Sequence, residues 1–546
     1  QALLTYRINA KWQLELLGNF SQSKFTLVPE EAQLTTSVLS PLFSANLGLD
    51  VYFEGREEDK YTTNMIGVSA IQQVHKNLRL KWMLSRFENN EQEAFDITSA
   101  YLFGERSFDK SQPEFGSIVN PLGAGTFTDH ARNRLSVEDW NLSHKGEWNN
   151  NNHFIQWGLG VEKTLINDHL GEWQAVDSAG YNLPYPSSQL QLSKVVKSTA
   201  DLDVNKLSGY IQDNISLGAA SNVTIQGGLR FNYNSLNNEF LLSPRAQMSW
   251  MPDAAKDWVV KLAAGLYHQP PFYRELRRYD GTVNTAVKAQ KSWQVVAGAD
   301  HNFRMWNRPS RMTVEAYYKH LWDVDPYDID NVRIRYFGDN SAKAYATGIE
   351  LRLFSELVKD AESWVSIGLM RTMEKIDDFY YYRYKNADGE FITIGTEDQV
   401  VTDSVRFDKG WMRRPTDRLV TFGMFFQDYL TTNKNFRVHL NMIFGTNMPY
   451  NIPGSVRYRN ALVIDPYIRV DIGFSVLLLD SDKSNRRSHN PFRKFDNIWA
   501  SLEVFNLLDR DNIISYMLIK DFSNTIYTIP NRLTPRLLNF KILARF

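Results

Sequence analysis

The chain has 546 residues, with 61 basic and 62 acidic side chains and a formal net charge of −1. This balance excludes the strongly basic surface that is typical of nucleic-acid-binding proteins, and the absence of cysteine excludes disulfides and thiolate metal sites. No run of about 18 apolar residues occurs, so the sequence predicts no transmembrane helix. Aromatic residues make up 13% of the chain, a content that fits a membrane β-barrel with aromatic girdles.

Segments with alternating apolar and polar residues recur from the first residues to the last. This alternation is typical of a β-strand with one apolar and one polar face. We count about 21 such segments of about 9–13 residues, the length at which a tilted strand crosses a bilayer. Their centres, in chain order, are Tyr6, Gly18, Asp50, Gly67, Trp82, Thr98, Trp140, Leu159, Ile211, Gly228, Ala246, Ala263, Val296, Ala316, Glu350, Ile367, Met424, His439, Ile472, Leu502 and Leu543.

The connections between these segments alternate between short and long, as in outer-membrane barrels, whose periplasmic turns are short and whose extracellular loops are long. A β-propeller would instead repeat at a constant spacing of about 40–50 residues. We therefore predict an all-β fold, a transmembrane antiparallel up-and-down β-barrel of the 22-stranded type. The longest connections are 104–132, 166–205, 270–288, 322–342, 374–414, 446–465 and 510–536.

The last ten residues, LLNFKILARF, form an alternating strand that ends on Phe546. A sheet that spans a bilayer must close on itself, because an edge would leave backbone groups unpaired in hydrocarbon. Bacterial single-chain barrels have an even number of strands, whereas our count is odd. With the C-terminus on the periplasmic side, the first strand would start outside the cell. We therefore expect residues 1–546 to form strands 2–22, with one strand ahead of Gln1.

Three stretches near the C-terminus, AYATGIELRLF (344–354), SLEVFNLLDRDN (501–512) and PRLLNFKILARF (535–546), resemble the closing strands of TonB-dependent receptors. The loops HQPPFYRELRRYDGTVNTAVKAQKS (268–292) and DPYDIDNVRIRYFGDN (325–340) resemble those of Bacteroidota members. The resemblance covers nearly the whole chain. It implies a barrel of the bacterial outer membrane that imports a ligand with energy delivered through TonB.

Members of this family also carry an N-terminal plug and a TonB-contacting box, and residues 1–546 contain neither. The resemblance therefore implies plug and TonB as partners through a part outside these residues, together with outer-membrane lipid and lipopolysaccharide. One alternative is a structural role, in which the barrel is a subunit of a larger outer-membrane complex with a lipoprotein or other subunits. A second alternative is a passive porin or usher-type pore. No phosphate loop, zinc-protease motif or nucleophile elbow occurs, so we expect neither an enzyme nor a cofactor.

Two extracellular loops carry the candidate ligand-binding residues. Exposed aromatic side chains beside polar groups suit ligand capture or a protein contact, and the arginines of the earlier loop could attract an anionic ligand or lipopolysaccharide phosphates. The alternatives are a packed extracellular hairpin for the aromatic loop and a rigid loop base with paired charges for the other. The candidates are Phe379, Tyr380, Tyr381, Tyr382, Tyr384, Phe272, Tyr273 and Arg274.

Further predictions concern cations, the lumen and assembly. Asp323, Asp325, Asp328 and Asp330 form a carboxylate run that is a weak calcium candidate; a solvated turn is the alternative. We expect the terminal aromatic Phe546, together with Phe540, to serve as the signal for barrel assembly, as the resemblance implies. The side chains predicted to face the lumen and the plug are Arg437, His439, Arg469, Asp471, Lys541 and Arg545.

Overall fold

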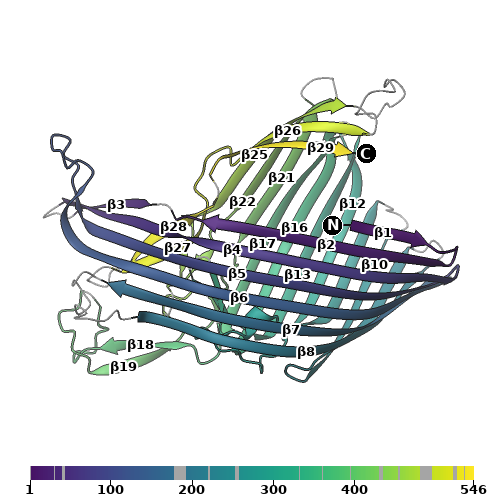
Figure 1. The fold of residues 1–546 in the computed structure, drawn as a ribbon, viewed down its shortest axis with the longest axis horizontal. Coiled ribbons are helices and arrows are strands. Elements are labelled where there is room, and N and C mark those ends of the chain that lie inside the picture. The colour runs from purple at the N-terminus through teal and green to yellow at the C-terminus, as the bar shows by residue number, and fades with distance from the viewer. Residues whose placement is uncertain are drawn as a thin grey trace.

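The fold consists almost entirely of antiparallel β-strands (Figure 1). The computed structural model describes residues 2–29, 31–39, 44–177, 192–218, 222–252, 257–330, 333–358, 361–393, 395–429, 435–452, 455–479, 495–520, 526–533 and 535–545. The helical element among them is a single turn, η1 (Tyr273–Leu276). No helix in this part of the chain has the length and apolar character needed to cross a membrane.

The main sheet has 21 strands in up-and-down order, in which β2 and β3 both pair with β4, and β20 and β21 both pair with β17. They are β1 (Ala2–Arg7), β2 (Trp12–Leu27), β3 (Ala32–Leu39), β4 (Ser44–His75), β5 (Leu78–Arg106), β6 (Ile118–Asn150), β7 (His153–Asp177), β8 (Leu192–Leu217), β9 (Val223–Asn234), β10 (Glu239–Trp250), β11 (Trp258–Gln269), β12 (Gln290–Met305), β13 (Arg308–Val324), β16 (Ala342–Val358), β17 (Ala361–Ile376), β20 (Met412–Arg413), β21 (Val420–Tyr429), β22 (Phe436–Gly445), β25 (Tyr467–Leu479), β26 (Asn497–Phe505) and β29 (Leu537–Arg545).

Four small hairpins lie in the long connections. They are β14 (Tyr327–Asp330) with β15 (Arg333–Tyr336), β18 (Tyr380–Lys385) with β19 (Asp403–Asp408), β23 (Pro449–Tyr450) with β24 (Leu462–Val463), and β27 (Ile513–Lys520) with β28 (Ile526–Arg532).

The number of strands agrees with the prediction, but two predicted boundaries are wrong. The centres Asp50 and Gly67 both lie on β4, and the centres Trp82 and Thr98 both lie on β5. The 21 predicted segments therefore correspond to 19 strands, and the short strands β3 and β20 complete the number. Strands β4 to β6 have 32, 29 and 33 residues, far more than the roughly 10 that cross a bilayer. Alternation alone does not mark where a strand leaves the membrane.

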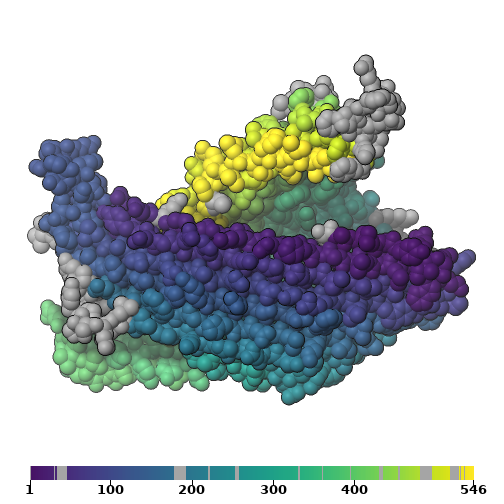
Figure 2. All heavy atoms as spheres, in the orientation of Figure 1, coloured from purple at the N-terminus to yellow at the C-terminus, as the bar shows by residue number. Residues whose placement is uncertain are grey.

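The sheet is strongly curved but has two edges. Among the described residues, no ladder joins β29 to β1, and Figure 2 shows an opening between the N-terminal and C-terminal strands. The strands β1 and β29 point in the same direction in Figure 1, so they cannot pair antiparallel with each other. The strand that we expect ahead of Gln1 stays a prediction.

The two faces of the sheet differ in chemistry. On β29, the side chains of Leu538, Phe540 and Ile542 are 68%, 66% and 61% exposed, and Phe540 lies opposite exposed Leu502 of β26. Such an exposed apolar face is expected where lipid rather than water surrounds the sheet. Lys541 belongs to the other face, which we call the polar face, and lies opposite Ser501. The alternation predicted for the C-terminal strand is therefore present.

Candidate functional site: a loop layer bound to an acidic wall

An acidic surface lines part of the polar face on the long strands. Alternation puts Glu57 and Asp59 of β4 on one face, and the ladder places Glu93 of β5 opposite Asp59. Asn133 of β6 lies opposite Glu93 and donates hydrogen bonds to both Glu93 and Glu172, at 2.7 and 2.8 Å. We call the following six side chains of β4, β5 and β7 the acidic wall: Glu57, Asp59, Glu91, Glu93, Asp168 and Glu172.

Two connections from the other side of the sheet supply arginines to this wall. We call residues 270–289, which contain η1, and residues 325–341, which contain the β14–β15 hairpin, the loop layer. Arg333 Nη2 lies 2.5 Å from Glu93 Oε1 and 3.7 Å from Glu57 Oε1, and Arg333 Nη1 lies 3.5 Å from Glu172 Oε1. Arg335 Nη2 is 3.6 Å from Glu172 Oε2.

The η1 segment is anchored to the same wall. The hydroxyl of Tyr273 donates a 2.5 Å hydrogen bond to Asp168, which also accepts one from Arg277. Arg274 Nη2 lies 2.7 Å from Glu91 Oε2. Four arginines of the loop layer thus face a wall of six carboxyl groups, so the carboxyl groups outnumber the arginines that bind them.

These contacts cross the interior of the curved sheet. The β14–β15 hairpin connects β13 to β16, whereas the acidic wall belongs to β4, β5 and β7, and the strands β8 to β12 lie between them in the ladder. Segments that far apart in a curved sheet can meet only on its concave side. The polar face is therefore the inner face, and the loop layer lies across the interior.

A buried arginine fixes the opposite side of the loop layer. Arg459, which is 2% exposed and lies in the connection between β23 and β24, donates hydrogen bonds to Asp328 and to the backbone oxygen of Tyr327. Its Nη2 also lies 3.2 Å from Glu374 of β17. The ring of Phe337 lies 4.8 Å from the same guanidinium. The free energy of a buried ion pair is favourable only when its geometry is good. The contacts of Arg459 therefore restrict the position of the base of the hairpin.

The loop layer contains carboxyl groups that titrate near neutral pH. Burial raises the pKa of Glu275 to about 7, against the backbone N–H of Phe272 and the side chain of Gln290, which favour its ionised form. Burial likewise raises the pKa of Asp325 to about 7, although the backbone N–H groups of Asp339 and Gly338 point at it.

The predicted ligand-binding residues fall into two separate places. In the loop layer, Tyr273 and Arg274 bind the acidic wall. For Arg274 this is the ion pairing that the alternative of a rigid loop base with paired charges expects. Phe272 is exposed and packs edge-on against Tyr336. The ring of Phe379 lies 5.6 Å from the guanidinium of buried Arg459.

The four predicted tyrosines belong to the β18–β19 hairpin, which projects beyond the sheet in Figure 1. Tyr381 stacks on Phe407 with 5.7 Å between ring centroids, and Arg406 lies 3.7 Å from the ring of Tyr380. Tyr382 and Tyr384 remain 48% and 50% exposed. The aromatic loop is thus a packed hairpin in which the rings of Tyr382 and Tyr384 are exposed.

The four aspartates of the calcium candidate have separate environments. Asp323 binds Lys291 at 2.8 Å, Asp325 accepts backbone N–H groups, and Asp328 is bound by Arg459. The backbone of Asp330 pairs with Arg333 in the hairpin. Among the described side chains, the carboxylates close enough to share one cation are Glu57, Asp59 and Glu93 instead, and Arg333 already lies against two of them.

The predicted lumen residues of the C-terminal strands share the polar face. His439 lies over Gly473, with its Nε2 3.9 Å from Glu503. Arg469 binds Asp471 at 2.7 Å. Arg437 covers the ring of Trp499 at 4.1 Å. Lys541 and Arg545 are exposed on β29. Phe540 lies on the apolar face, and Phe546 is outside the described residues.

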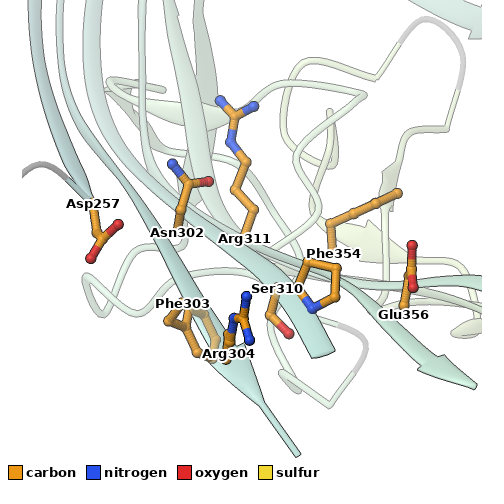
Figure 3. Close-up of a pocket in the computed structure, with 9 residues that line it drawn as sticks. Asp257, Asn302, Phe303, Arg304, Ser310, Arg311, Phe354 and Glu356 are labelled. Atoms are coloured by element: carbon orange, nitrogen blue, oxygen red, sulfur yellow. The ribbon is translucent and has the colours of Figure 1, made fainter. Parts of the chain in front are cut away.

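A cavity of about 530 Å³, which the sequence did not predict, lies at the short-turn end of β12, β13 and β16. Figure 3 shows acidic Asp257 and Glu356 on opposite sides of it, with Arg304 between them. Beside it, Asp300 of β12 is bound by Lys261 and Arg311, at 2.5 and 2.8 Å. The cavity carries both signs of charge and lies at the other end of the strands from the loop layer.

The curved up-and-down sheet, the apolar outer face and the polar interior define a membrane β-barrel. The chain belongs to the family described as TonB dependent receptor-like, beta-barrel, whose pattern matches residues 5–507. This places it among outer-membrane transport proteins. No protein with a curated function matches the chain in sequence.

Solved structures share the fold. The siderophore receptor PiuA from Acinetobacter baumannii is 11% identical, with a TM-score of 0.53 over 98% of this chain and 76% of that one. BauA, the ferric preacinetobactin receptor of the same organism, is 11% identical, with a TM-score of 0.51 over 99% and 76%.

Proposed function

We propose that this chain is the wall and the extracellular loops of a TonB-dependent importer, with the loop layer as the cover of its ligand chamber. The observation that carries the proposal is the cross-barrel contact of Arg333 with Glu93 and Glu172, which holds the β14–β15 hairpin over the interior. A passive porin needs an open lumen, whereas this interior is crossed by a hairpin bound at both ends.

In this mechanism the ligand enters between the loop layer and the wall. Because the wall carries more carboxylates than the loops carry arginines, its contacts with the loop layer can be exchanged for contacts with a ligand. The plug, TonB and the inner-membrane motor that the family resemblance implies would then open the path to the periplasm, on the side where β29 ends. We also propose that the protein comes from a bacterium of the Bacteroidota type.

The experiment compares two deletion strains of the source bacterium, one lacking this gene and one lacking TonB, on a panel of sole nutrients that contains iron chelates, cobalamin, glycans and peptides. We expect the strain without this protein to lose growth on a nutrient that the TonB mutant also cannot use. A nutrient lost in the first strain alone, or full growth of that strain on every nutrient that the TonB mutant fails to use, contradicts TonB-dependent import.

The β18–β19 hairpin favours the second candidate function, a subunit role in a larger outer-membrane complex. Exposed tyrosines are frequent anchors of protein interfaces, and Tyr382 and Tyr384 are half exposed on this projecting hairpin. A stoichiometric partner that co-purifies with the native protein and is lost with Tyr382→Ser and Tyr384→Ser would support this role. Purification without a partner, combined with a TonB-dependent nutrient, would exclude it as the main function.

A further inference from the structure

The guanidinium of Arg333 lies in a cage of three carboxyl groups and one aromatic ring. The carboxyl groups are those of Glu57 on β4, Glu93 on β5 and Glu172 on β7, so three strands of the wall contribute to the cage. The guanidinium carbon lies over the ring of Phe95, 4.8 Å from its centroid. Carboxylates and the face of an aromatic ring both attract a planar guanidinium. The wall thus has the chemistry to recognise this group, and the loop layer supplies one.

Arg333 fills the cage incompletely. Its guanidinium is 2.5 Å from Glu93, but 3.7 and 3.5 Å from Glu57 and Glu172, which is longer than a hydrogen bond. Oδ1 of Asp59, a carboxyl group within 4.8 Å of those of Glu57 and Glu93, is shielded from solvent and accepts no hydrogen bond from any described residue. A buried acceptor without a donor is costly. A ligand that brings further donors therefore satisfies the cage better than Arg333 does.

Charged pairs on the outer face show that the cage lies beyond the lipid. Arg56 and Glu58, the neighbours of Glu57 on β4, belong to that face and pair at 2.9 Å, with Arg56 66% exposed. Asp96, opposite Arg56 in the ladder, is bound by Arg132. Exposed charges on the outer face are expected in water rather than in hydrocarbon. The cage is therefore level with the long connections, which the proposed import function puts outside the cell.

We propose that this cage recognises a guanidinium group of the ligand, and that Arg333 occupies it as an internal competitor until the ligand arrives. The inference rests on the proposed import function and specifies the ligand of that same chamber. A ligand guanidinium has the charge and planar shape of the Arg333 side chain, so it can take over the contacts with Glu93 and Phe95. Displacement of Arg333 then releases the β14–β15 hairpin from the wall. A primary ammonium lacks the planar fork that binds a carboxylate through two parallel hydrogen bonds, so it fits the cage less well.

The test measures binding to the complete protein, purified in mild detergent, by isothermal titration calorimetry. The probes are the tripeptide Ala-Arg-Ala, the same tripeptide with lysine or with citrulline in the middle, and free arginine. Citrulline keeps nearly the shape of arginine and has no charge. Arg333→Met empties the cage, and Glu93→Gln removes the nearest charge while keeping the shape. Glu58→Gln, next to Glu57 but on the outer face, is the matched control. Heat-dependent gel mobility verifies that each variant is a folded barrel.

We expect Arg333→Met to bind Ala-Arg-Ala about tenfold more tightly than wild type, because the internal competitor is gone. Glu93→Gln should bind it about tenfold more weakly, since a charge-assisted hydrogen bond is lost. Glu58→Gln should match wild type, and the lysine and citrulline peptides should bind more weakly than the arginine peptide. Tighter binding of the tripeptide than of free arginine identifies a peptide as the ligand, and the reverse identifies the amino acid.

Three results would each overturn the proposal: no binding of either arginine probe to wild type and Arg333→Met, equal binding of the arginine and citrulline peptides, or unchanged affinity in Glu93→Gln. These results are distinguishable from a failure of the import function. Binding as expected, without TonB-dependent growth on an arginine ligand, contradicts import and supports the cage. TonB-dependent growth on another nutrient, without binding of the arginine probes, supports import and overturns the cage.

Discussion

The guanidinium of Arg333 lies 2.5 Å from the carboxylate of Glu93, although 240 residues separate them in the sequence. This contact joins a hairpin from one side of the barrel to the wall on the other side. Arg333 is also close to Glu57 and Glu172, so a single side chain gathers carboxylates from three strands. The docking of the loop layer on the acidic wall should therefore depend strongly on Arg333.

Arg333→Glu should detach the hairpin from the wall, because it replaces an ion pair with repulsion from three carboxylates. Hydrogen bonds to charged groups contribute about 1.5–3 kcal/mol each, which corresponds to roughly a tenfold or larger rise in the open population. Limited proteolysis of the protein in outer-membrane vesicles measures this as faster cleavage within residues 325–341. Arg406→Glu, on the projecting β18–β19 hairpin, is the control and should leave that cleavage unchanged. Equal rates in Arg333→Glu and wild type would refute the anchoring role.

The docking of the loop layer should weaken as the pH rises. Glu275 and Asp325 have pKa values raised to about 7 by burial, above their ordinary values of 4.5 and 3.8. The undocked loop therefore releases these protons first, and docking loses stability as the pH rises from the ordinary values of 3.8 and 4.5 to about 7. Protease cleavage of the loop layer should be faster at pH 8 than at pH 5.5.

Glu275→Gln should reduce this pH dependence, because the amide stays neutral throughout. The control is Asp280→Asn in the same loop, where the side chain and backbone N–H of Thr282 lower the pKa of the carboxyl. This control should not reduce the difference between pH 8 and pH 5.5. Cleavage that slows as the pH rises would contradict the assignment.

The sequence predicted the fold well, because alternation is a local property and a bilayer demands it on every strand. It could not predict the loop layer. The partners of Arg333 are charged residues on strands that alternate as any inner face would, and nothing local distinguishes Glu93 from a solvated lumen residue. The partner of Asp328 was equally impossible to predict, because Asp328 lies in an acidic run that suggested a cation site. Its partner is a buried arginine, Arg459, 131 residues further along the chain.

Arg459→Met should destabilise the loop layer more than any exposed substitution. The change leaves buried Asp328 and Glu374 without their shared cation, and removing one partner of a buried charge pair costs about 3–5 kcal/mol. Thermal unfolding with protease digestion should show early release of residues 325–341. Arg457→Met, two positions away and exposed, should behave as wild type. If both substitutions had equally small effects, Arg459 would not be the anchor at the base of the hairpin.

The register of β29 can be tested by the chemistry of single cysteines, because the chain has none of its own. Lys541→Cys, on the polar face opposite Ser501, should react with a charged, water-soluble maleimide in outer-membrane vesicles that have been made permeable to the reagent. Ile542→Cys, next in sequence and opposite Ala500, should be protected by lipid and react only after solubilisation in detergent. The opposite order of reactivity would reverse the two faces of the sheet. Such a reversal would place the polar face, and with it the acidic wall that binds Arg333, against the lipid, where unpaired carboxylates are not tolerated.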